Sequence, residues 1–147
     1  MDEEKTKSTC TTVRIFHFKT HLLAHSFFCR EWEDKIKRMN APLETWLDYL
    51  KWIKDIYPTG SELYFSTLEK CTRHFQSHPT YQNDTRYIHL WISLADHIRD
   101  DDELYKFLYS QEIGKMVSVF YMAWADVKEK MGKDAIANQI YEKGFKV

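Results

Sequence analysis

Residues 42–58 read PLETWLDYLKWIKDIYP, and the spacing of their apolar side chains decides the fold class. Apolar residues recur at intervals of three and four, which is the period of an α-helix that buries one face. That face consists of Leu43, Trp46, Leu47, Leu50, Ile53 and Tyr57. A second apolar stripe consists of Tyr49, Trp52 and Ile56. A helix with two apolar stripes is predicted to pack on two sides.

The same helical period continues through most of the chain. It predicts further helices at about residues 18–36, 61–77, 84–98, 104–113 and 116–131, and a last one from about residue 135. Ser61 and Asp84 suit the N-cap position, because their side chains accept hydrogen bonds from the free amides of a first helical turn. Gly114 and Gly132 suit helix ends. With only four Gly and three Pro to interrupt it, the chain is predicted to be all-α.

Internal repetition predicts how these helices are arranged. Three segments share an aromatic residue followed three positions later by a large and then a smaller residue. They are Trp46-x-x-Tyr49-Leu50, Trp91-x-x-Leu94-Ala95 and Tyr121-x-x-Trp124-Ala125. After the third segment, Ala137, Tyr141 and Gly144 follow at the separations of a tetratricopeptide repeat, whose period is about 34 residues. We therefore expect an irregular tetratricopeptide-like array of antiparallel helix pairs, with about three units in a right-handed superhelix and an insertion around residues 76–84.

The size of the chain favours a single domain with one core. We expect this domain to cover residues 13–147, after a flexible tail of residues 1–12. The predicted core contains the aromatic and aliphatic residues whose period matches the packing faces. They are Trp46, Leu50, Trp52, Trp91, Tyr121 and Trp124. Stacked helix pairs leave broad outer surfaces that bind peptides, so the sequence predicts a protein-binding module.

Composition argues against several other classes of function. The net charge is -1, from 21 basic and 22 acidic residues that are mixed along the chain, so no basic surface for nucleic acid is expected. No run approaches the roughly 18 apolar residues of a membrane span. The sequence has no Gly-rich phosphate loop, nucleophile elbow or HExxH motif, so we expect neither an enzyme nor a cofactor.

The sequence contains two groups of potential metal ligands. Four lie at intervals of four residues, namely His17, His21, His25 and Cys29. Twelve residues of helix extend about 18 Å, so at most two of these side chains could share one ion, and nothing completes the coordination shell. The acidic run at residues 100–103 lacks the ligand spacing of a calcium loop and is interpreted as a helix start favoured by the helix dipole. No metal site is predicted.

Four motifs, in this order and spacing, resemble a known family. They are NAPLETWLDYLKWIKDIYPTG at residues 40–60, YQNDTRYIHLW at 81–91, FLYSQEIG at 107–114 and FYMAWA at 120–125. They are similar to the N-terminal homology region of the Bub and BubR spindle-checkpoint kinases and their Mad-type relatives. The resemblance covers roughly residues 31–147.

The resemblance implies a tetratricopeptide-like domain that acts in the spindle assembly checkpoint and contributes to kinetochore localisation. Its implied partner is the large outer-kinetochore scaffold protein, which such domains bind through short amphipathic helical motifs. Carried over by position, the contact region falls on Leu94, Ile98, Glu103 and Leu104. The implied location is the nucleus and the kinetochore, with a cytoplasmic pool. A kinase domain is expected elsewhere in the parent protein and not in this chain.

At part of this region the sequence differs from the Bub branch. Ile98 is apolar and Asp101 is charged at positions where that branch has the opposite character. An alternative interpretation stays open beside the checkpoint module. WLDYLKW, at residues 46–52, also resembles the aromatic signature of half-a-tetratricopeptide repeats, which form scaffolds in RNA processing. Those arrays normally run much longer than this chain.

Overall fold

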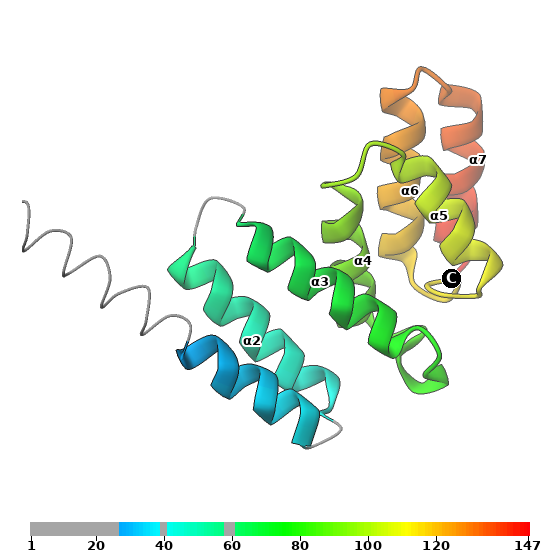
Figure 1. Ribbon diagram of the computed structural model, residues 1–147. Helices are drawn as coiled ribbons and strands as arrows, with labels where there is room; N and C mark the ends of the chain where they lie inside the picture. The colour runs from blue at the N-terminus through cyan, green and yellow to red at the C-terminus, as the bar shows by residue number, and fades with distance from the viewer. Residues whose placement is uncertain (1–26, 39–40, 58–60) are drawn as a thin grey trace, which may run out of the picture. The chain divides into compact units, whose positions relative to one another are not determined.

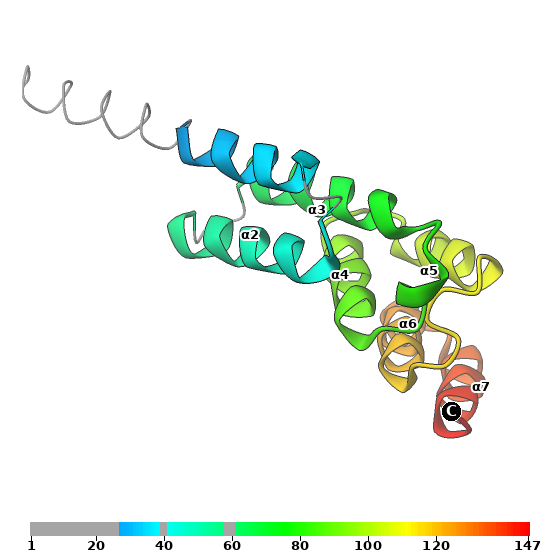
Figure 2. The same ribbon diagram turned by 90° about the horizontal axis from the view of Figure 1, so that it is seen from below.

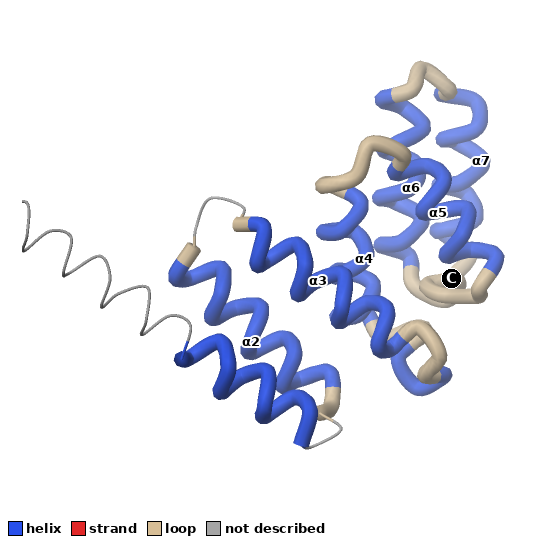
Figure 3. Tube along the Cα trace, viewed as in Figure 1, coloured by secondary structure: helices blue, strands red, loops and turns tan. Residues whose placement is uncertain are grey.

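The computed structural model describes residues 27–38, 41–57 and 61–147. All regular elements in these ranges are helices, and none of the described residues forms a strand (Figure 3). The predicted all-α fold class is confirmed. None of the helices in the same ranges combines the length and the apolar composition needed to span a bilayer. The predicted tail of residues 1–12 and the start of the predicted helix at 18–36 lie outside the described residues.

The helices follow one another with short connections (Figure 1). They are α2 (Leu43–Ile56), α3 (Glu62–Phe75), the short 3-10 helix η1 (Pro79–Tyr81), α4 (Thr85–Ala95), α5 (Asp101–Ser110), α6 (Ser118–Lys130) and α7 (Asp134–Phe145). Residues 27–38 are also helical. The chain divides into two compact units, residues 1–49 and residues 50–147, so the boundary falls inside α2. In the first unit, the rings of Trp32 and Tyr49 are stacked with their centroids 5.5 Å apart.

Two helices, α3 and α4, start at the capping residues that the sequence predicts. Ser61 precedes α3, and its hydroxyl accepts a hydrogen bond from the amide of Tyr64. Asp84 precedes α4, and its carboxylate accepts one from the amide of Arg86. Both predicted caps are confirmed, since each side chain satisfies an amide that has no partner inside the helix.

The end of α4 differs from the prediction. The helix ends at Ala95, so Ile98 lies in the following turn and not on the helix with Leu94. The amides of His97 and Ile98 reach carbonyl oxygens only three residues back, at 3.1 and 3.0 Å. The His97 ring nitrogen Nδ1 also lies 2.7 Å from the carbonyl oxygen of Ser93. This tightened last turn and its side-chain contact end the helix before Ile98.

In the second unit, α3 packs on α4, α4 and α5 pack on α6, and α6 packs on α7. Figures 1 and 2 show α6 and α7 side by side as an antiparallel pair. Small residues allow this approach: a Cβ on Gly144 would lie 2.8 Å from the Cβ of Tyr121. Antiparallel pairing of this kind is the unit of the predicted array. The number of units, the hand of the superhelix and the 13–147 domain boundary stay predictions.

Five of the six predicted core residues are buried: Trp46, Leu50, Trp91, Tyr121 and Trp124. The prediction for Trp52 was wrong, because this side chain is only half-buried. Trp52 belongs to the second stripe of α2 and lies about 120° around the helix axis from Trp46. Within the second stripe Tyr49 is buried, Trp52 is half-buried and Ile56 is exposed, so this stripe is covered only at its start.

Residues of the YQNDTR motif join two loops that are distant in sequence through hydrogen bonds. The carbonyl oxygen of Gln82 accepts a hydrogen bond of 2.8 Å from the amide of Gly114. The side-chain oxygen Oδ1 of Asn83 accepts one of 3.0 Å from the amide of Met116. The ring of Tyr81 packs edge-on against Phe75 at 4.9 Å. The region of the predicted insertion thus holds η1 and ties the connection between α3 and α4 to the connection between α5 and α6.

Gly114 and Gly132 form a matched pair for testing this region. Both have a positive φ, 80° and 72°, so alanine strains the backbone at either position. A Cβ at Gly114 would also lie 2.9 Å from Phe120 Cδ2 and 3.1 Å from Ile88 Cδ1, whereas nothing lies within 4 Å at Gly132. Gly132→Ala should lower the free energy of unfolding by about 1 kcal/mol, and Gly114→Ala by about 2–4 kcal/mol because it adds a core clash. Urea unfolding of the two variants measures the difference, and equal losses would contradict it.

Candidate protein-binding groove

An open groove in the second unit brings together residues of α3, α4, α5 and the turn after α4. Its lining residues are Glu69, Thr72, Arg73, Gln76, Trp91, Leu94, Ile98, Leu104 and Phe107. Trp91 and Leu94 are buried, whereas Ile98 is 39% and Phe107 is 41% exposed. Exposed apolar side chains of this size beside buried ones leave an apolar surface that a partner can cover.

The two walls of the groove differ in chemistry. On α5, Leu104 and Phe107 are one turn apart and therefore lie on the same face of the helix. On α3 the lining side chains are polar, and Arg73 forms an ion pair of 2.6 Å with Glu69. The hydroxyl of Thr72 donates to carbonyl oxygens within its own helix. One wall thus offers apolar contacts, and the other offers charges at an exposed rim.

The structure brings together three of the four predicted contact residues. Leu94, Ile98 and Leu104 line the groove. Glu103 does not; its exposed carboxylate forms an ion pair of 2.7 Å with Lys106 on the same helix. Sequence reasoning also missed Phe107, although its position three residues after Leu104 is a signal that it shares that face. It also missed the polar side chains of α3 that line the groove, because no local sequence pattern predicts that they face it.

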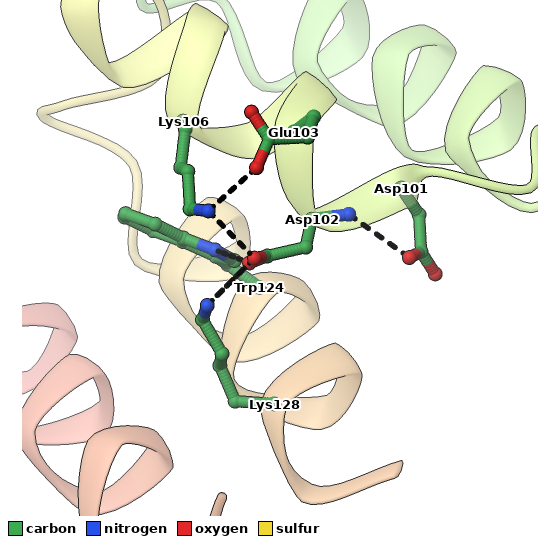
Figure 4. Close-up of polar contacts among 6 residues, drawn as sticks. All are labelled: Asp101, Asp102, Glu103, Lys106, Trp124 and Lys128. Carbon is green, nitrogen blue, oxygen red and sulfur yellow. Dashed lines mark hydrogen bonds and ion pairs between the residues drawn. The ribbon is translucent and has the colours of Figure 1, made fainter. Parts of the chain in front are cut away.

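A second feature lies where the first turn of α5 meets α6 (Figure 4). The carboxylate of Asp102 accepts hydrogen bonds from the indole Nε1 of Trp124 at 3.0 Å and from Lys128 Nζ at 2.7 Å. Lys106 Nζ lies 3.1 Å from the same carboxylate and also binds Glu103. The side chains of Asp102 and Lys128 are only 10% and 6% exposed. We call Asp102, Trp124 and Lys128 the α5–α6 charge cluster.

The charge of Asp102 is stabilised by its donors. Burial alone raises the pKa of this carboxyl, but the hydrogen bonds from Lys128, Trp124 and Lys106 outweigh burial and lower the pKa from 3.8 to about 2. Asp102 is therefore ionised at neutral pH, opposite a buried ammonium group. The sequence predicted an acidic start for α5, and Asp101, Asp102 and Glu103 do occupy its first turn. No pattern in the sequence predicted that the side chain of Asp102 is buried against α6.

The described residues include potential metal ligands and the thiol of Cys71. No group of three His, Cys, Asp or Glu side chains in those residues is arranged to hold a metal ion. Three members of the histidine and cysteine stripe lie outside the described residues, namely His17, His21 and His25. Cys71 is buried, and burial raises the pKa of its thiol to about 12, which leaves it unreactive near neutral pH.

Stacked helices and an open groove place the molecule in the class of tetratricopeptide-like helical domains. The chain belongs to the family described as Mad3/BUB1 homology region 1, which it matches over residues 28–145. The resemblance inferred from the four sequence motifs is confirmed.

Curated relatives of the chain are spindle-checkpoint proteins. The mitotic spindle checkpoint component mad3 of Schizosaccharomyces pombe is 36% identical over 109 residues, which cover 72% of this chain and 35% of the relative. BUBR1 of Arabidopsis thaliana is 36% identical over 106 residues, covering 71% and 27%. The mouse mitotic checkpoint serine/threonine-protein kinase BUB1 is 32% identical, covering 72% and 10%. The chain thus spans from a tenth to about a third of the length of these relatives.

Solved structures agree with this assignment. A chain in the crystal structure of the mitotic checkpoint complex matches with a TM-score of 0.77 and 29% identity, over 88% of this chain and 62% of that chain. The conserved N-terminal domain of BUB1 matches with a TM-score of 0.73 and 24% identity, over 86% and 67%. The second match shows the shared fold. The predicted tetratricopeptide-like fold class is confirmed.

Asp102 predicts a specific dependence of stability on pH. A carboxyl whose pKa is lower in the folded state than in the unfolded state stabilises the fold above its unfolded pKa, and this contribution is lost as the pH falls from about 4 towards 2. Wild-type protein should be up to about 2 kcal/mol more stable than Asp102→Asn at pH 7, and this difference should shrink by pH 2. Urea unfolding between pH 7 and pH 2 measures it.

The matched control is Asp126→Asn, which removes a carboxylate from an exposed ion pair with Lys130 on α6. Exposed pairs contribute less than about 1 kcal/mol, so this change should have little effect at any pH. A wild-type advantage over Asp102→Asn that stays constant across the pH range would contradict the assigned charge of Asp102.

Proposed function

We propose that the chain is the protein-binding module of a spindle assembly checkpoint protein, and that it contributes to kinetochore localisation by binding short amphipathic motifs of the outer-kinetochore scaffold protein. Family membership and the names of the curated relatives support the checkpoint role. They favour it over a scaffold in RNA processing. The proposal includes a location in the nucleus and at the kinetochore, with a cytoplasmic pool, and a kinase domain elsewhere in the parent protein.

The observation that carries the proposal is the groove between α3 and α5. An amphipathic helix binds by laying its apolar side chains, spaced by three and four residues, into such a groove. Ile98, Leu104 and Phe107 supply exposed or half-buried apolar contacts, beside the buried Trp91. A few apolar anchors of this kind carry most of the binding energy in an interface.

Charges at the rim of the groove supply specificity. The ion pair of Glu69 and Arg73 belongs to the α3 wall, and the pair of Glu103 and Lys106 is on α5. Rim charges contribute little affinity, because water screens them, but they select the orientation and register of a charged ligand. In this proposal Glu103 acts at the rim, whereas Leu94, Ile98 and Leu104 act inside the groove.

The test introduces a charge into the groove without opening the core. Ile98→Glu and Leu104→Glu place a carboxylate where apolar ligand residues would lie, and a buried unpaired charge is costly. Each should raise the Kd about tenfold or more. Fluorescence anisotropy with labelled peptides that cover the amphipathic segments of the scaffold protein from the same organism measures the effect. Leu94 is a poorer choice, because it is buried and its replacement would destabilise the fold.

The matched control is Ile136→Glu, since Ile136 is 44% exposed on α7, outside the groove. This variant should bind with the wild-type Kd, and circular dichroism should show the same helix content in all three variants. An unchanged Kd in both groove variants, or an equal loss in the control, would show that the groove is not the binding site.

A further inference from the structure

α5 has two faces with different roles. Leu104 and Phe107 line the groove, whereas Asp102, Tyr105 and Leu108 are buried, and α5 packs on α6. Around the helix axis, Leu104 lies about 200° and Phe107 about 140° from Asp102. Asp102 is therefore on the side opposite the groove. Because a short helix moves as a rigid element, a shift or rotation at Asp102 also displaces Leu104 and Phe107.

Apolar and aromatic packing fixes the approximate position of α5. The ring of Tyr105 contacts α6 at centroid distances of 5.6 Å to Phe120 and 6.5 Å to Trp124. The free energy of apolar contacts is roughly proportional to the buried area, and aromatic pairs add a preference for offset and tilted arrangements. Several ring arrangements satisfy this preference, so it restricts the rotation of the helix less sharply than a charge-assisted hydrogen bond does.

The α5–α6 charge cluster adds a more sharply directional constraint on α5. Lys128 Nζ lies 2.6 Å from Oδ1 and 2.7 Å from Oδ2 of Asp102, and Trp124 Nε1 lies 3.0 Å from Oδ1. Trp124 and Lys128 are one turn apart on α6, so they hold the carboxylate from two points along that helix. Charge-assisted hydrogen bonds weaken steeply when distance or angle changes. Figure 4 shows the carboxylate enclosed by these donors.

Stability alone is a weak reason for burying this ion pair. The desolvation of two charges offsets much of their attraction, and an apolar pair of similar volume is often as stable or more so. A buried ion pair does differ from an apolar pair in geometry, because it has one favourable arrangement. The pair joins α5, which lines the groove, to the central helix α6. Its arrangement therefore affects the shape of the groove.

We propose that the α5–α6 charge cluster fixes the position of α5 and thereby the width and shape of the groove, so that Asp102 and Lys128 are positioning residues for ligand binding. This inference rests on the proposed function, since the ligand is the scaffold peptide that the groove is proposed to bind. Neither residue lines the groove. Both act through Leu104 and Phe107.

The experiment separates positioning from stability. Lys128→Met leaves the buried carboxylate of Asp102 with only Trp124 and the exposed Lys106 as donors, so it should lower both the free energy of unfolding and the peptide affinity. The double variant Asp102→Leu/Lys128→Met replaces the pair by apolar side chains, so its free energy of unfolding should return to the wild-type value or above it. Its Kd for the labelled scaffold peptide should nevertheless stay about fivefold higher than that of the wild type, because α5 is no longer fixed. A double variant that recovers both stability and affinity would overturn the proposal.

A matched control removes one carboxylate and one ammonium group from the exposed surface of α6 alone. Asp126 and Lys130 form an exposed ion pair of 2.6 Å on α6. Asp126→Leu/Lys130→Met should leave the Kd unchanged. A loss of affinity equal to that of the buried double variant would assign the effect to net charge and would also overturn the proposal.

A measurement without peptide keeps this inference distinct from the proposed function. Methyl NMR follows the nuclear Overhauser effects between Leu104 on α5 and Leu94 and Ile98 on the other side of the groove. These effects should weaken in the buried double variant, while those between Ile136 and Ile140 on α7 stay constant. If no peptide binds the wild type but the cross-groove effects weaken, the proposed ligand is wrong and the positioning role is supported. Unchanged cross-groove effects would overturn the positioning role whether or not peptide binds.

Discussion

The aromatic face of α6 is the constraint on which the second unit depends. Phe120 and Trp124 contact Tyr105 of α5 from one side, while α4 and α7 pack on the same helix. These side chains bury large areas and are therefore a main source of the free energy that holds α4, α5, α6 and α7 together. Their bulk also limits how closely the neighbours approach, which is why glycine occurs at positions 114 and 144, where a Cβ would lie within 3 Å of an aromatic side chain.

Sequence periodicity was sufficient for the helices and for most of the core, because both follow from one local rule about which face meets water. It did not predict that α4 ends before Ile98 or that Trp52 is only half-buried. Ile98 continues the apolar period of α4, but the backbone turns before it through hydrogen bonds that apolar spacing does not encode. Trp52 lies at the edge of an apolar arc whose width is set by its neighbours. The polar wall of the groove and the inward turn of Asp102 depend on helices distant in sequence, so no local pattern could reveal them.

Charge has two separate roles around the groove. The exposed pairs Glu69–Arg73 and Glu103–Lys106 are in contact with water and can exchange partners at little cost when a ligand arrives. The buried pair Asp102–Lys128 cannot do so, because separating it would leave an unpaired charge away from water. The same few turns of α5 therefore combine an adaptable outer surface with a fixed inner attachment. This division would suit the proposed binding role, in which the groove keeps one shape and the rim charges select the ligand.

The hydrogen bonds from Gly114 to Gln82 and from Met116 to Asn83 have a consequence for local opening of the chain. They join the α3–α4 connection to the α5–α6 connection. In the second bond, the two residues are 33 positions apart in the sequence. Surface connections commonly exchange their amide hydrogens through small, independent openings that cost little free energy. Here neither connection can open without releasing the other, and releasing both exposes Ile88 and Phe120 of the core. The amide hydrogen of the buried residue Gly114 should thus exchange with solvent more slowly than is usual for a loop.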